Sequence, residues 1–159
     1  MSKDKIICEK KGMFLKLANS PSSYSRISDF SREYTQLIQT APHLRNTQAS
    51  PVGIQCFIEN KEKEILAVAV LAVDNDECGV EISYFFVKSK ERRKGVGYFF
   101  LENLVKYCQH QYSKLAVISI TVIEGSDWIK EGGSIRLFTK FGFHPILTMH
   151  NYYELVLRD

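Results

Sequence analysis

The segment Glu91–Tyr98, with the sequence Glu-Arg-Arg-Lys-Gly-Val-Gly-Tyr, joins a run typical of a β-strand to a run typical of an α-helix. Residues 80–87 upstream are rich in β-branched and aromatic side chains. Downstream, apolar residues recur at helical spacing over residues 96–108. A strand that turns through glycines into a helix directs N–H groups and the positive end of the helix dipole at the turn. Three basic side chains add full charges there, so the segment predicts a phosphate-binding turn.

The spacing of the glycines excludes two common classes of phosphate-binding loop. A dinucleotide fingerprint requires a third glycine three residues after Gly97, where this chain has Phe100, and no P-loop string occurs. The remaining pattern, Arg92-x-x-Gly95-x-Gly97, resembles the Q/R-x-x-G-x-G/A signature of the GCN5-related N-acetyltransferase (GNAT) superfamily. In that family the loop holds the pyrophosphate of acetyl-CoA. The alternative is a tight strand-to-helix turn flanked by solvated basic residues.

Two further segments strengthen the resemblance. Residues 134–143 are similar to the second family signature, in which Gly142 ends a helix and Phe143 opens a strand. Glu81 lies eleven residues before Arg92, the spacing of a glutamate that serves as general base in several members. The resemblance covers the chain from about residue 12 to its end. It implies an α+β fold with a mixed, mostly antiparallel central sheet, helices on both faces and a splayed strand pair that admits the pantetheine arm.

Length and composition are those of one ordinary globular domain, which we expect to span residues 1–159. The net charge of +3 is too small to predict nucleic-acid binding but is compatible with an anionic cofactor. The four cysteines lie far apart and no histidine has metal-ligand spacing, so neither a disulfide framework nor a metal site is expected. The longest apolar run has nine residues, and the first residues lack a signal-like apolar stretch. We therefore expect a cytoplasmic protein without a membrane partner.

The order of the elements follows from periodicity and turn residues. We expect strands over residues 13–18, 53–58, 64–73, 80–87 and 115–123, with two further β-type runs in 143–157. A helix is expected to begin at Ser20-Pro21, and residues 40–52 read as a loop. Strand alternation places Glu81, Ser83 and Phe85 on one face of their strand and Val80, Ile82 and Tyr84 on the other.

The resemblance also assigns the cofactor-binding residues. Backbone N–H groups of the turn hold the pyrophosphate, the basic side chains neutralise it, and pantetheine pairs along the strand at residues 85–87, where an N–H near Val87 polarises the acetyl carbonyl. The candidate cofactor-binding residues are Phe86, Val87, Arg92, Arg93, Lys94, Gly95, Val96, Gly97, Tyr98 and Phe138.

Glu81 is the candidate general base, acting through a water molecule. An unpaired glutamate between Val80 and Ile82 in a central strand is expected to lie in a cleft. The alternatives are a structural salt bridge and a glutamate that faces solvent at a strand end.

Phe138 departs from the family pattern, because many members carry a tyrosine there whose hydroxyl protonates the leaving thiolate. Three explanations stay open. A thiol with a pKa of about 8.5 needs little acid catalysis; another phenol, at Tyr98, Tyr152 or Tyr153, reaches the sulfur; or the protein binds the cofactor without turnover.

These observations predict an N-acetyltransferase that moves an acetyl group from acetyl-CoA to a primary amine of a small molecule or protein by direct attack. No cysteine stands in a nucleophile context, which disfavours an acyl-enzyme. The alternatives are a non-catalytic acyl-CoA-binding or sensor module, a nucleic-acid-binding protein and a toxin-like enzyme that acetylates charged tRNA. A homodimer is common in the superfamily, but no residue here predicts one.

Overall fold

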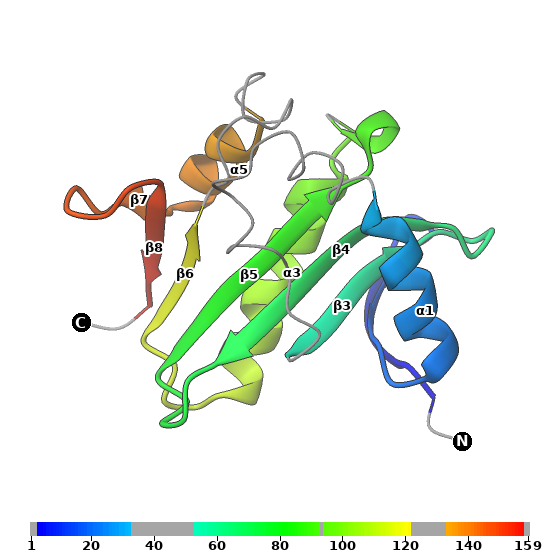
Figure 1. Ribbon diagram of the computed structural model, residues 1–159, viewed down its shortest axis with the longest axis horizontal. Helices are drawn as coiled ribbons and strands as arrows, with labels where there is room; N and C mark the ends of the chain where they lie inside the picture. The colour runs from blue at the N-terminus through cyan, green and yellow to red at the C-terminus, as the bar shows by residue number, and fades with distance from the viewer. Residues whose placement is uncertain (1–2, 33–52, 93, 122–132, 158–159) are drawn as a thin grey trace.

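The computed structural model describes residues 3–32, 53–92, 94–121 and 133–157 (Figure 1). In these ranges the chain forms eight strands, three α-helices and one short 3-10 helix. The strands are β1 (Lys5–Lys10), β2 (Met13–Leu17), β3 (Ile54–Glu59), β4 (Ile65–Val73), β5 (Gly79–Val87), β6 (Val117–Thr121), β7 (His144–Pro145) and β8 (Tyr152–Val156). The helices are α1 (Pro21–Phe30), η2 (Ser89–Glu91), α3 (Val96–Gln111) and α5 (Gly133–Phe141).

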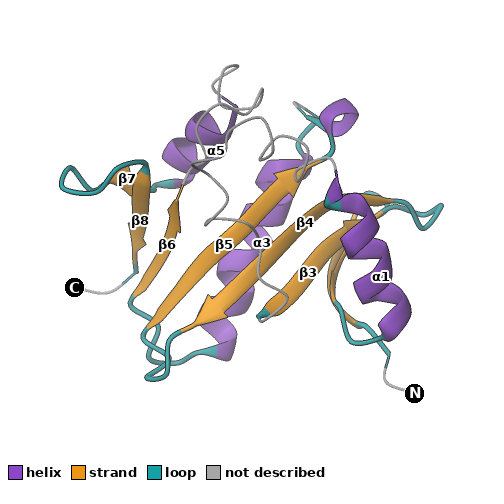
Figure 2. Ribbon diagram, in the orientation of Figure 1, coloured by secondary structure: helices purple, strands orange, loops and turns teal. Residues whose placement is uncertain are grey.

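All eight strands form one sheet, in the order β1-β2-β3-β4-β5-β6-β8-β7. Every neighbouring pair is antiparallel except β5 and β6, which are parallel and joined through α3. Figure 2 shows α1 and α3 on opposite faces of the sheet. The predicted α+β class with a mostly antiparallel sheet covered on both faces is therefore confirmed.

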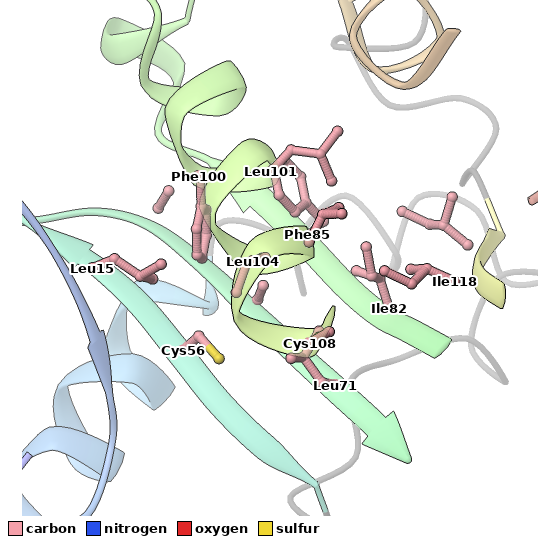
Figure 3. Packing of buried hydrophobic residues seen from close by; sticks show 14 of the residues in the cluster. Leu15, Cys56, Leu71, Ile82, Phe85, Phe100, Leu101, Leu104, Cys108 and Ile118 are labelled. Carbon is pink, nitrogen blue, oxygen red and sulfur yellow. The ribbon is translucent and has the colours of Figure 1, made fainter. Parts of the chain in front are cut away.

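Each face of the sheet has its own hydrophobic cluster. The larger cluster lies between α3 and the sheet (Figure 3). Its strand residues include Leu71, Ile82 and Phe85, and Phe100 and Leu104 of α3 pack on them. The smaller cluster lies under α1; its members are Ala18, Ile27, Phe57, Ile65, Val68, Val70, Tyr84 and Phe86. The central strands β4 and β5 are thus buried on both faces, which explains why their sequences are almost continuously apolar.

The predicted boundaries agree closely with those of the elements. Ser20 caps α1 and accepts a hydrogen bond from the Ser23 N–H at 3.2 Å. Gly142 ends α5 with φ +112°, as its place after the helix predicts. The strand β1 was not predicted, since its charged sequence lacks apolar alternation and it is held by pairing with β2. The predicted helix beyond residue 32 and the loop at 40–52 lie outside the described residues.

The predicted alternation along β5 is wrong beyond Ile82. The pairing of β4 with β5 shifts between Val70 and Leu71, so that Ser83 is an extra residue in β5. Val80 and Ile82 face the α3 side with Phe85, and Tyr84 lies on the α1 side. Glu81 consequently shares its face with Tyr84, and not with Phe85 as strict alternation predicts.

The strands β5 and β6 separate after a short paired stretch. Their parallel register runs from Gly79 with Val117 to Ile82 with Ile120. β5 then continues to Val87 while pairing only with β4 among the described strands. The predicted splayed pair is present, and the gap opens on the β6 side of residues 83–87. Among the described helices, none is long and apolar enough to cross a membrane.

A buried ion cluster fixes α1 to the sheet. The Glu59 side chain, only 5% exposed, contacts the Lys16 Nζ at 2.7 Å and the Arg26 Nη1 at 2.9 Å. Burial raises the pKa of Glu59, but the hydrogen bonds and charges of the two cations lower it by more, so the net shift is downward. The carboxylate is therefore expected to be charged and to stabilise the fold at neutral pH.

We expect Glu59→Gln to lower the free energy of unfolding by about 3 kcal/mol at pH 7, because it leaves two cations without their shared anion. Urea unfolding followed by circular dichroism measures the change, with Glu62→Gln at an exposed position as the control. Because the folded pKa is lowered, the wild-type advantage should be full above the unfolded pKa of about 4.3 and should disappear as the pH falls below the folded value. An advantage that is unchanged at pH 2 would contradict the ion cluster.

Candidate functional site

The turn between β5 and α3 presents backbone N–H groups to open space. Gly95 caps α3 with φ +86° and no side-chain cap, and a Cβ built on it meets no atom within 4 Å. The first N–H that bonds back to this cap is that of Phe99, which donates to the Gly95 carbonyl at 3.0 Å. The N–H groups of Val96, Gly97 and Tyr98 come before that bond, so they point out of the helix end.

Gly97 has a different role from Gly95. A Cβ at Gly97 would lie 3.2 Å from Leu137 Cδ2 and 3.5 Å from Val87 Cγ2. The glycine therefore lets the first turn of α3 pack closely against α5 and the end of β5. Gly95 thus faces open space, whereas Gly97 allows close packing within the protein.

The basic residues of the turn are not equivalent. Arg92 folds back on the strand, where its Nε donates to the Val87 carbonyl at 3.1 Å and its guanidinium lies 5.1 Å from the Phe86 ring centroid. Lys94 is exposed and lies 3.9 Å from a Glu91 carboxylate oxygen. Arg93 lies outside the described residues. Arg92 thus braces the end of β5, and Lys94 is the described cation of the turn that can reach an anion.

The backbone of β5 is directed into the gap at two residues. Lys88 N–H, just after the strand, donates to the Leu66 carbonyl of β4 at 2.8 Å. Because N–H groups alternate in direction along a strand, those of Val87 and Phe85 point away from β4. The side chain of Phe86 points to the α1 face and is 2% exposed. The predicted N–H near Val87 therefore faces the gap.

Phe138 is part of the core. Its ring is 1% exposed and packs edge-on against Phe85 at 5.4 Å and Phe143 at 5.3 Å between centroids. Tyr98 lies at the start of α3, 40% exposed, with its ring 5.7 Å from Phe141. The structure thus brings Phe138 beside β5, whereas Tyr98 belongs to the turn.

Glu81 lies on the exposed part of the α1 face. Its register partners are Ala72 of β4 and Ser119 of β6. It forms no ion pair with any residue that the structure describes, so the structural salt bridge is not found there. The Glu81 side chain is exposed to solvent. Burial within a cleft, which the sequence predicted, is thus not seen in the described part of the chain.

Three of the four cysteines are poor nucleophiles in this fold. Cys56 of β3 and Cys108 of α3 are buried in the cluster between α3 and the sheet, and burial raises the pKa of Cys108 to about 12 and that of Cys56 as well. Burial also raises the pKa of Cys8. In the described ranges, no group of histidine, cysteine and acidic side chains is arranged to hold a metal ion.

Comparison with known proteins gives a consistent answer. The profile of the acetyltransferase (GNAT) family matches residues 24–143. A GNAT-family acetyltransferase from Staphylococcus aureus Mu50 superposes with a TM-score of 0.64 at 16% identity, over 92% of this chain and 99% of that one. The spermidine N-acetyltransferase of Vibrio cholerae, solved with CoA and spermine, gives 0.61 at 10% identity over 92% and 96%. No curated protein sequence matches the chain.

We expect Cys56 and Cys108 to resist iodoacetamide at pH 8 until the protein unfolds, since alkylation requires an accessible thiolate. Cys8 and Cys78, which are partly exposed, should be labelled first. Mass spectrometry of peptides from native and urea-unfolded protein measures the order. Rapid native labelling of Cys108 would show that the thiol is more accessible than this packing allows.

Proposed function

The chain belongs to the acetyltransferase (GNAT) family, and from this premise we propose that it transfers an acetyl group from acetyl-CoA to a primary amine of a small molecule or protein. The observation that carries the proposal is the gap between β5 and β6, together with a helix N-terminus that has no side-chain cap and lies beside the end of β5. This arrangement offers N–H donors to a linear ligand at one edge and to its phosphates at one end. A dinucleotide or P-loop site has neither the strand edge nor this glycine spacing.

The residues of the turn fit a CoA pyrophosphate. Any Cβ at Gly95 would enter the open space that we assign to the pyrophosphate. The N–H groups in the first turn of α3 would donate hydrogen bonds to it, and Lys94 would supply positive charge. Phe85 and Val87 would hold the pantetheine arm by strand-like pairing, and an N–H of this edge would polarise the thioester carbonyl. When bound, CoA supplies an activated acyl group with a thiolate leaving group.

Glu81 is the proposed base. Its carboxylate lies one residue before the last paired position of β5, on the face opposite α3. From there it can take a proton, through water, from an amine that approaches the gap. Direct attack by the amine fits the buried, weakly acidic thiols better than an acyl-cysteine.

A non-catalytic acyl-CoA-binding module is the second candidate. The observation that favours it is the buried Phe138, which offers no hydroxyl at the position where many family members carry one. Such a module would bind acetyl-CoA at the same turn and show no turnover with any amine.

We expect acetyl-CoA to raise the midpoint of thermal unfolding by several degrees, whereas ATP and NAD should not. A ligand at one hundred times its dissociation constant stabilises the folded state by about 2.7 kcal/mol. Gly95→Glu should abolish the shift because it places bulk and negative charge in the phosphate site. Gly12→Glu, at another left-handed glycine (φ +79°) remote from the turn in the sheet order, is the control and should keep it. An equal shift with ATP would replace acetyl-CoA by another phosphate ligand.

Glu81→Gln should reduce turnover by about 100-fold while the acetyl-CoA shift is retained, because general-base catalysis typically contributes that much. Release of free thiol from acetyl-CoA, measured against a panel of small amines and N-terminal peptides between pH 6 and 9, gives the rate. Glu77→Gln, in an exposed turn, is the matched control. Unchanged rates across this pH range would remove Glu81 from the role of base, and a silent wild type with a normal shift would favour the non-catalytic module.

A further inference from the structure

A row of polar side chains crosses the sheet beside the gap. The strand registers pair Glu81 of β5 with Ser119 of β6, Ser119 with Glu154 of β8, and Glu154 with His144 of β7. Paired residues lie on the same face of a sheet and are spaced by about 4.8 Å per strand. The row therefore extends from the proposed base across β6 to the far edge of the sheet. The sequence predicted Glu81 alone, because the other members are brought to it only by strand pairing.

Tyr152 connects the members of this row. Its phenol donates to Glu154 Oε2 at 3.2 Å, and the Ser119 hydroxyl lies beside it. Ser119 is 9% exposed, so this hydroxyl is held away from solvent. Its hydrogen bond lowers the pKa of Tyr152, but burial and the Glu154 and Glu81 carboxylates raise it by more, and the net shift is upward. The phenol is therefore held protonated between a donor and an acceptor.

The register also places Tyr152 beside the opening of the gap. Ile120 is the last β6 residue paired with β5, and Tyr152 pairs with the next residue, Thr121. The backbone of Tyr152 thus lies at the level where the strands separate, and its hydroxyl, which bonds to Glu154, reaches back toward the level of Glu81 on the same face. An acyl group bound in the gap would be separated from Tyr152 by a single strand.

The other phenols near the gap are placed differently. Tyr98 lies at the phosphate turn, and Tyr153 faces the α3 cluster, because it pairs with Ile120. Tyr84 is on the same face as Glu81 but is 2% exposed and packed in the cluster under α1. Phe138 has no hydroxyl. Of these side chains, Tyr152 alone combines the right face, the right level and partial exposure.

We propose that Tyr152 is the proton donor to the leaving thiolate, and that Ser119 and Glu154 position it; the inference rests on the proposed acetyl transfer. As the amine nitrogen bonds to the carbonyl carbon, its proton passes to Glu81. When the C–S bond breaks, its electron pair goes to sulfur, which takes the phenol proton. The Ser119 hydroxyl then donates its proton to the phenolate and is itself reprotonated by the carboxylic acid of Glu81. One proton leaves the amine and one arrives at the thiol, so Glu81, Ser119 and Tyr152 return to their starting protonation states.

The first test compares variants on adjacent residues. We expect Tyr152→Phe to lower kcat by about 100-fold with the most reactive amine of the panel, and to leave the thermal shift with acetyl-CoA unchanged. Tyr153→Phe, whose side chain faces the α3 cluster, should retain wild-type kcat. The loss should be largest below the thiol pKa of about 8.5 and should shrink above it, because a free thiolate then needs no donor. A defect that is independent of pH indicates a structural role and overturns the proposal.

The outcomes separate this inference from the proposed function. Wild-type turnover that survives Tyr152→Phe removes Tyr152 and leaves acetyl transfer intact. A pH-dependent loss of kcat in Tyr84→Phe, but not in Tyr152→Phe, would also overturn the proposal. Absence of turnover in the wild type with every amine counts against acetyl transfer itself, and with it against a proton donor.

A second measurement uses the protein without any ligand. Ultraviolet titration of the wild type, with Tyr152→Phe subtracted, reports the ionisation of this phenol. We expect Glu154→Gln to lower the pKa of Tyr152, because a neighbouring negative charge is lost, and Ser119→Ala to raise it, because the phenolate loses a donor. Glu81 and His144, the other two charged or titratable members of the row, are left unchanged in these variants. If neither substitution moves the pKa, the chain through Ser119, Tyr152 and Glu154 does not exist and the proposal fails.

Discussion

The parallel pairing of β5 with β6 ends after Ile82 and Ile120, and the candidate site depends on that separation. A complete ladder would satisfy the outward N–H groups of β5 within the sheet and leave nothing for a ligand. The extra residue at Ser83 lies just where the ladder ends. A bulge increases the local twist of a strand, so it is a physical reason for the divergence. The same bulge returns Phe85 to the α3 face and keeps the end of β5 buried on both sides.

The hydrophobic core holds this open edge in place. Phe85 packs against Phe100 at 5.2 Å and Phe138 at 5.4 Å on one face, while Phe86 packs under α1 on the other. Arg92 ties the last carbonyl of the strand to the turn. An edge that is fixed from both faces can present its N–H groups at a constant spacing without pairing to another strand. Preorganised donors of this kind are what transition-state stabilisation requires.

The sequence predicts this structure well wherever one local rule determines the outcome. Ser20 and Gly142 mark helix ends through their own backbone preferences, and the glycines of the turn follow from the same logic. The bulge at Ser83 could not be predicted, because it depends on how β4 and β5 pack against helices on opposite faces. The row from Glu81 to His144 was equally hidden, since its members lie far apart in the chain and meet only through strand order. Phe138 could be recognised as lacking a hydroxyl, but its burial depends on tertiary contacts with Phe85 and Phe143.

A proton donor on the sheet, as proposed for Tyr152, has its geometry fixed differently from one on a helix. A hydroxyl on α5 depends on how that helix packs, and Phe138 shows that the position is used here to fill the core. The position of a phenol on β8 is instead fixed by the backbone ladder: Tyr152 lies two strands across from Glu81 and two residues further along, because it pairs with Thr121 and not with Ser119. Ser119 belongs to the row of the proposed base, and the proposed donor lies diagonally across from it on β8. In the proposed reaction, a proton taken from the amine would pass to the leaving group along the sheet surface, and the loss of the helix hydroxyl does not by itself imply the loss of catalysis.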